Sequence, residues 1–129
     1  MLTPNIFEAN LLSGLEIRNK EDIENAAINI IGMGVKAVLL KGGGLTNMKG
    51  KDFFLDINGR KEWLVNKIVN TENTHGSGCT LSAAICGYKA LGFELIEAVK
   101  KAKLFVEKSL ENSYKLGSGP GPLGHDNNF

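Results

Sequence analysis

The six residues Thr74-His75-Gly76-Ser77-Gly78-Cys79 (THGSGC) stand directly before a pattern that is typical of a buried-face helix. Apolar residues recur there at helical spacing until Gly92, at Leu81, Ala84, Ile85, Tyr88 and Leu91. The sequence therefore predicts a glycine-rich loop directly before the start of a helix, and this loop is the strongest indication of fold and function in the chain.

This loop has the chemistry of an anion site. The first four N–H groups of a helix lack partners inside it, and the helix dipole adds about half a positive charge there. Gly76 and Gly78 let a phosphate approach without a Cβ in the way, and Ser77 and Thr74 offer hydroxyl donors. In its thiolate form, Cys79 could accept a proton.

A simpler interpretation of the same residues stays open. The glycines can serve only a turn, Ser77 or Thr74 can cap the helix, and Cys79 can be a small core residue. The coincidence of two glycines, two hydroxyls and a thiol favours the anion site. His75 is assigned a minor role, because a single loop histidine more often bonds to backbone.

Towards the N-terminus the pattern predicts two helices. The first begins at Ile6 and ends at Gly14, and the second runs from Glu21 to Met33. Asn5 and Glu8 have the spacing of a capping box. They could instead hold magnesium through water, but spacing alone favours the cap.

Between these helices and the loop, strands are expected. VKAVLL (35–40) has the pattern of a strand covered on both faces in a parallel sheet. KGGG (41–44) follows it, and Lys41 is either a surface lysine or a phosphate contact. Asn58-Gly59 predicts a hairpin over 52–69 with a type I′ turn.

The element order gives an α/β fold. Both glycine-rich loops follow predicted strands, so we expect them to converge on one crevice. A long helix is predicted over about 94–116, and the glycine- and proline-rich tail from residue 117 is expected to be a loop or a frayed end.

Composition excludes several classes of protein. The 129 residues fit one domain, and a net charge of +1 without blocks of one sign disfavours nucleic-acid binding. The apolar runs are too short to span a membrane and no signal-peptide pattern is present, so we expect a cytoplasmic protein. Cys79 and Cys86 would lie about 10 Å apart on one helix, too far for a disulfide.

Four segments together resemble a known family. They are TPNIFEA (3–9), AVLLKGG (37–43), NTENTHGSGCTLSAAI (70–85) and GSGPGP (117–122). In this order they are similar to the hydroxymethylpyrimidine and phosphomethylpyrimidine kinases of thiamine biosynthesis, in the ribokinase-like superfamily. Within that superfamily, pyridoxal kinases are the family most easily mistaken for these kinases.

The resemblance implies ATP- and Mg²⁺-dependent phosphorylation of a hydroxymethylpyrimidine and then of its monophosphate. It implies an anion hole formed by residues 76–79, with Cys79 where sugar-kinase relatives carry an aspartate base. Asn5 and Glu8 then match the motif that positions magnesium and phosphates, which reverses the preference for a pure cap. The implied nucleotide-binding residues are Asn5, Glu8, Lys41, Gly42 and Thr74, with Glu8 on the metal through water.

Two departures from the family pattern stand out. Gly44 occupies a position where the family usually has histidine, which puts that contact in doubt. The chain also resembles only the C-terminal half of such a kinase, so residues 1–129 are expected to be the nucleotide-binding half of a three-layer α/β/α fold.

Three hypotheses follow for the chain. In the first it is half of a kinase, inactive until the N-terminal half is supplied. In the second it is a self-sufficient homodimer in which each copy replaces the missing layer of the other. In the third it is a non-catalytic module that binds a nucleotide or a pyrimidine phosphate; a pyridoxal kinase-like activity is a further alternative.

Overall fold

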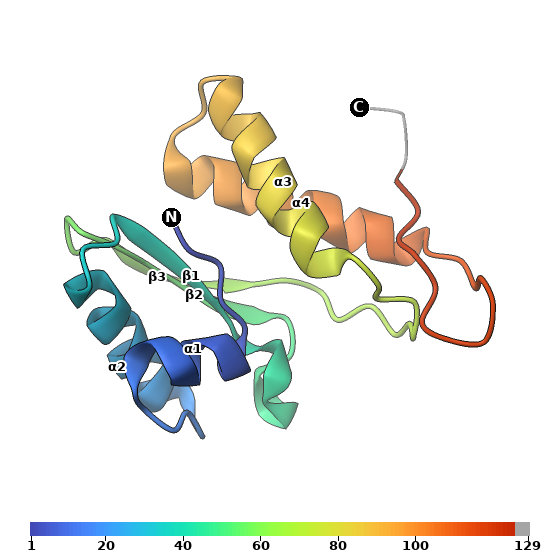
Figure 1. The fold of residues 1–129 in the computed structure, drawn as a ribbon. Helices are drawn as coiled ribbons and strands as arrows, with labels where there is room; N and C mark the ends of the chain where they lie inside the picture. Colours follow the sequence, from blue (N-terminus) through green and yellow to red (C-terminus); the bar gives the residue numbers. More distant parts are fainter. Residues whose placement is uncertain (126–129) are drawn as a thin grey trace. The chain divides into compact units, whose positions relative to one another are not determined.

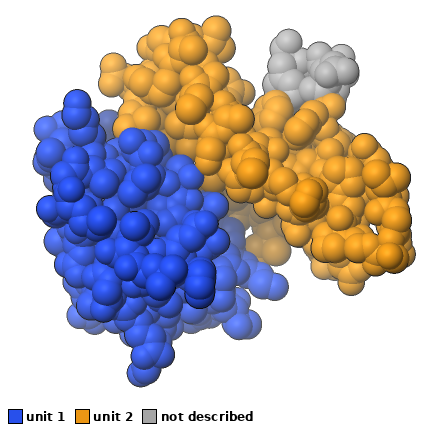
Figure 2. All heavy atoms as spheres, in the orientation of Figure 1, with its two compact units in different colours: residues 1–65 blue, residues 66–129 orange. Residues whose placement is uncertain are grey.

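The computed structural model describes residues 1–125, and the chain forms two compact units. Unit 1 is Met1–Val65 and unit 2 is Asn66–Phe129, coloured separately in Figure 2. Within the described residues, no helix has the length and apolar character needed to cross a bilayer.

Unit 1 is a small antiparallel sheet with two helices (Figure 1). The helices are α1 (Ile6–Ser13) and α2 (Lys20–Gly32), and the strands are β1 (Ala37–Lys41), β2 (Lys51–Asp56) and β3 (Lys61–Val65). Two short 3₁₀ turns, η1 (Gly42–Gly44) and η2 (Thr46–Met48), connect β1 to β2. The strand order is β1-β2-β3, with Leu39 opposite Phe54 and Phe53 opposite Trp63.

One apolar core holds α1 and α2 against the sheet. Its buried members are Ile6, Ala9, Ile17, Ile23, Ala26, Ala27, Ile30, Val38, Leu40, Met48, Phe53 and Leu55. Val38 and Leu40 alternate with Leu39 along β1, and all three are fully buried. The prediction that this strand is covered on both faces is therefore confirmed.

The predicted parallel pairing of this strand is confirmed on one side only. β1 pairs antiparallel with β2, whereas the segment before α1 pairs parallel with it through a bridge between Leu2 and Val38. The N–H of Leu39 donates to Leu2 O at 2.9 Å in that bridge. An uninterrupted apolar run reports burial on two faces and carries no information on the direction of the neighbour.

The hairpin around Asn58-Gly59 is confirmed, but its predicted turn type is wrong. Among the described residues only glycines have a positive φ, and Gly59 has φ 80° while Asn58 does not. The carboxylate of Asp56 instead organises the loop, accepting from the N–H groups of Asn58 and Arg60 at 2.9 Å each. β3 ends at Val65, so THGSGC does not directly follow a strand as expected.

Unit 2 contains helices α3 (Ser77–Ala90) and α4 (Leu95–Glu111), which pack against each other. The predicted apolar stripe of α3 is buried only in part: Leu81 and Ile85 are buried, whereas Leu91 is 75% exposed. The segment before α3 is tied to α4 by Asn66, whose side chain donates to Glu107 at 2.7 Å. Lys67 donates to Glu111 at 2.9 Å, and that hydrogen bond raises the pKa of Lys67.

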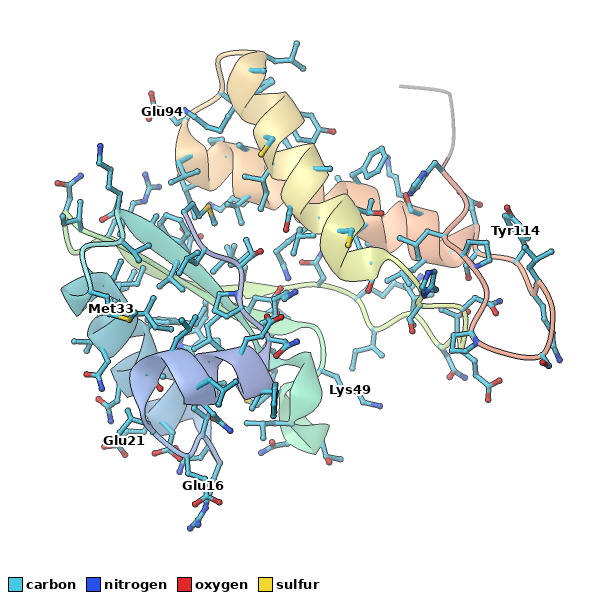
Figure 3. All side chains as sticks on the ribbon, viewed as in Figure 1. Glu16, Glu21, Met33, Lys49, Glu94 and Tyr114 are labelled. Carbon is cyan, nitrogen blue, oxygen red and sulfur yellow. The ribbon has the colours of Figure 1, made fainter. Side chains whose placement is uncertain are left out.

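The glycine-rich tail is a packed loop through residue 125, not a frayed end. Its Leu123 is buried, and the N–H of Gly124 donates to Ser109 O at 3.0 Å. The N–H of Tyr114, labelled in Figure 3, donates to Pro122 O at 3.4 Å. The part of the prediction that covers residues 126–129 lies outside the described residues.

Candidate active site

The start of α3 carries the residues of THGSGC. Gly76 is the N-cap residue, with φ 85° and ψ 3°, a left-handed conformation that glycine adopts without strain. It turns the chain from the irregular segment 71–75 into the helix, so that residues 76–79 form its first turn. The predicted helix start is thus confirmed within one residue.

Three backbone N–H groups in this turn are free. Ser77 N donates to Thr74 O at 3.2 Å, but the N–H groups of Gly76, Gly78 and Cys79 have no hydrogen-bond partner among the described residues. Unpaired amides at a helix N-terminus, together with the helix dipole, favour an anion. The turn therefore offers three donors and a positive end to a phosphate-sized group.

The structure removes two of the simpler interpretations. No side chain caps α3. Neither the Ser77 nor the Thr74 side chain therefore accepts a hydrogen bond from a backbone N–H of the first turn, as a capping residue would. Cys79 is exposed, so its thiol is not a core residue. Cys86, one helical heptad further along, is also exposed and serves as a comparison for Cys79.

A distant loop holds the THGSGC segment in place. His75 N donates to Gly121 O at 3.2 Å, and Gly121 N donates to the side-chain oxygen of Asn73 at 3.0 Å. A Cβ at Gly121 would collide with the backbone oxygen of Tyr114 and with the Asn73 side chain. Only glycine fits at position 121, so packing explains this glycine of the GSGPGP segment. The backbone contact of His75 agrees with the minor role assigned to it.

In unit 1, Asn5 and Glu8 form the predicted capping box at the start of α1. Asn5 Oδ1 accepts from Glu8 N at 2.8 Å, and Glu8 Oε2 accepts from Asn5 N at 2.9 Å. Both residues are exposed. Glu8 Oε1 has no hydrogen-bond partner in the part of the chain that the structure describes, so it is free to face a ligand.

Lys41 and Gly42 lie beside this helix start. The N–H of Lys41 donates to Pro4 O at 2.9 Å, and no carboxylate pairs with its ammonium among residues 1–125. Gly42 N already donates to the buried carboxylate of Asp52 at 3.1 Å. A Cβ at Gly42 would collide with the backbone oxygen of Lys51, so packing by itself requires this glycine.

The predicted site residues fall into two groups. Asn5, Glu8, Lys41 and Gly42 lie together in unit 1, and Thr74 with residues 76–79 lies in unit 2. That both groups serve one nucleotide stays a prediction. No group of three or more His, Cys, Asp or Glu side chains that could hold a metal occurs among the described residues.

Sequence reasoning missed two neighbours of Cys79. Thr80 Oγ1 and His125 Nε2 lie 3.3 Å apart, and both line the same surface hollow as Cys79. His125 is 46 positions beyond Cys79 in a segment without periodicity. No local signal in the sequence could have found it.

Comparison with known proteins identifies the family. A family model described as phosphomethylpyrimidine kinase matches residues 1–124. The chain is 44% identical to the hydroxymethylpyrimidine/phosphomethylpyrimidine kinase of Synechococcus elongatus over 126 residues, 97% of this chain and 48% of that protein. It is 38% identical to the pyridoxine kinase of Bacillus subtilis, over 97% of this chain and 46% of that protein.

A solved structure agrees with the sequence comparisons. The pyridoxal kinase of Staphylococcus aureus in complex with AMP-PCP and pyridoxal has a TM-score of 0.90 and 37% identity, covering 96% of this chain and 47% of that one. The expected α/β, ribokinase-like fold class is thereby confirmed. The chain spans about half the length of the curated relatives it matches. By the match over residues 1–124, it belongs to the phosphomethylpyrimidine kinase family.

Proposed function

We propose that this chain is the nucleotide-binding, C-terminal half of a kinase that transfers phosphate from ATP to hydroxymethylpyrimidine and then to its monophosphate. The observation that carries the proposal is the start of α3. Within residues 76–79 it has three free backbone N–H groups and an exposed thiol. Phosphoryl transfer depends mainly on positioning and on stabilising charge, and free amides supply both.

Residues 76–79 are proposed to form the anion hole. The N–H groups of Gly76, Gly78 and Cys79 would bind the oxygens of the transferring phosphoryl group, and the Ser77 hydroxyl would add a donor. The exposure of Cys79 leaves its sulfur accessible to a substrate hydroxyl. None of these groups needs to break an existing hydrogen bond to do so.

The transfer forms one bond and breaks one. In the first transfer the substrate's hydroxymethyl oxygen bonds to the γ-phosphorus of ATP, the bond from that phosphorus to the bridging oxygen breaks, and ADP leaves. In the second transfer a phosphate oxygen of the monophosphate is the attacking atom, and the same bond breaks. The hydroxyl proton passes to the thiolate of Cys79 when this residue acts as the base. A second role, in which the thiol only orients the hydroxyl, is separated from the first by the Cys79 variants discussed below.

Unit 1 is proposed to supply the nucleotide and magnesium contacts. Glu8 keeps one carboxylate oxygen free while the other completes the capping box, which suits a metal contact through water. Lys41 is a cation without a carboxylate partner among the described residues and would bind a phosphate. Asn5, Gly42 and Thr74 complete the proposed nucleotide site, with Gly42 acting through its packing.

A second candidate function is phosphorylation of pyridoxal or pyridoxine. The pyridoxine kinase of B. subtilis is 38% identical to this chain, and pyridoxal kinase structures match it at a TM-score of 0.90. Both functions use the same anion hole. They differ in the ring that is recognised, and hydroxymethylpyrimidine is preferred because the family model that matches is that of phosphomethylpyrimidine kinase.

A coupled ADP-release assay tests the proposal. We compare the free 129-residue chain with a chimera in which the N-terminal half of the S. elongatus relative precedes Met1. We expect ATP-dependent turnover of hydroxymethylpyrimidine by the chimera and none by the free chain. Pyridoxal, assayed in parallel, decides between the two candidate functions.

Three results would contradict the proposal. A folded chimera that binds ATP without any turnover would favour the non-catalytic module. Turnover by the free chain that sediments as a dimer would favour the self-sufficient homodimer. Turnover restricted to pyridoxal would replace the substrate.

A further inference from the structure

A surface groove runs along α3, and apart from Cys79 none of its lining residues has a role in the proposed chemistry. We propose that it is the docking surface for an apolar helix face from the half of the kinase that full-length relatives have in addition to this chain. The inference rests on the proposed function, because that function requires a second half.

The groove has the shape of a helix-binding surface. Its volume is about 780 Å³, and Ala83, Ala84, Gly87 and Leu91 line it along the length of α3. These positions follow i, i+1, i+4 and i+8 spacing, which places them on one stripe of a helix. Phe105 of α4 borders the stripe. A partner helix that lies in a groove contacts such a stripe at successive turns.

Two polar side chains of the groove, those of Thr80 and His125, are already paired with each other. Thr80 Oγ1 and His125 Nε2 lie within hydrogen-bond distance at 3.3 Å, and the His125 ring lies 5.9 Å from that of Phe105. Small-ligand pockets usually present a few polar groups that fix the orientation of the ligand. Since Thr80 and His125 engage each other, and the stripe of Ala83, Ala84, Gly87 and Leu91 has no polar side-chain atom, an apolar peptide surface fits the groove better than a small polar molecule.

Gly87 lies at the centre of the stripe and leaves it open. A Cβ built at Gly87 would meet no atom within 4 Å. Its φ is not positive, and it stands in the interior of α3, where glycine weakens a helix. Nothing within the chain therefore explains this glycine. A partner backbone that approaches α3 closely does explain it, because a side chain at residue 87 would hold the partner away.

The length of the relatives identifies the occupant. This chain covers 48% of the S. elongatus enzyme and 46% of the B. subtilis enzyme, so each has a further half that must pack somewhere. Leu91, at 75% exposed, lies at one end of the groove, and Cys79 lines its other end. A segment docked here would reach the candidate catalytic thiol. A second copy of this chain would cover the groove without supplying the remaining half.

The test substitutes groove residues in two contexts, the free chain and the chimera defined above. Gly87→Leu should leave the denaturant midpoint of the free chain unchanged or higher, because the site is open and leucine favours a helix. In the chimera the same change should lower the midpoint and reduce ADP release at least tenfold. Leu91→Lys, at a site that is exposed in the free chain, should show the same contrast.

Gly32→Leu is the matched control. Gly32 is also a helical glycine at which a Cβ meets nothing within 4 Å, but it lies in α2. It should have the same effect in the free chain and in the chimera. The contrast between the two contexts is therefore specific to the groove.

The outcomes separate this inference from the proposed function. If each of Gly87→Leu and Leu91→Lys has the same effect in the chimera as in the free chain, the docking surface is overturned, even if the chimera is an active kinase. A context-specific loss of stability in a chimera without turnover would support the docking surface while the proposed function fails. A free chain that sediments as a dimer, and becomes a monomer with Gly87→Leu, would assign the groove to a second copy and overturn the proposal.

Discussion

The two helix starts that carry predicted site residues are built in opposite ways. At α1, Asn5 and Glu8 satisfy each other's backbone N–H groups through side chains three residues apart. At α3, Gly76 provides no side chain, and three N–H groups stay unpaired among the described residues. The first start is complete within itself, whereas the second is available to a ligand.

The difference also shows in how each start is held. The capping box of α1 needs only four consecutive residues. The start of α3 is held from outside, through His75 N on Gly121 O and Gly121 N on Asn73 Oδ1. Because the unpaired amides of this turn do not fix its position, its support comes from a distant loop.

The largest expected effect is that of Cys79→Ala on catalysis. In the chimera it should lower kcat about 100-fold or more, the range for a lost proton acceptor, with the KM for ATP nearly unchanged. Cys86→Ala, which removes the other exposed thiol of α3, should leave kcat unchanged. Partial recovery with Cys79→Asp would show that the residue acts as a base, and equal rates for Cys79→Ala and the wild type would assign no chemistry to the thiol.

Gly121→Ala should have the next largest effect, on stability. The new Cβ collides with the backbone oxygen of Tyr114 and with Asn73, and such overpacking costs about 2 kcal/mol. Urea unfolding of the 129-residue chain measures it. Gly119→Ala is the control, since a Cβ there meets nothing within 4 Å. If both variants unfold at the same urea concentration, the distant support of α3 is not needed.

Alanine substitutions at the two helix starts compare them directly. Asn5→Ala removes a cap acceptor and should lower the free energy of unfolding by about 1 kcal/mol. Ser77→Ala should change it by less than about 0.5 kcal/mol, because no side chain caps α3. An equal loss at both positions would mean that Ser77 caps α3 in solution.

Glu8→Gln should have the smallest effect on stability while separating the two roles of Glu8. Glutamine also completes a capping box, so the unfolding free energy should change by less than about 0.3 kcal/mol. A neutral amide binds magnesium more weakly than a carboxylate. The magnesium concentration for half-maximal rate in the chimera should therefore rise several-fold. An unchanged magnesium dependence would leave Glu8 with the cap alone.

Much of the structure was predictable because it depends on neighbours along the chain. The capping box at Asn5 and Glu8, the helix that follows THGSGC and the hairpin around Gly59 each arise from contacts within a few residues. The predicted type of the hairpin turn was wrong. The carboxylate of Asp56 accepts hydrogen bonds from the loop amides, and Asn58 keeps a negative φ. A dipeptide signal does not include that competing side chain.

What the sequence by itself determined is where helices begin and which residue types stand at each start. Tertiary structure alone decided that β1 pairs antiparallel with β2, that Gly121 supports His75 across 46 positions, and that the thiol of Cys79 is exposed. The physical reason is the range of the interactions. Caps and helical periodicity act over three or four residues, whereas strand direction, loop anchoring and exposure depend on which distant segments the folded chain brings together.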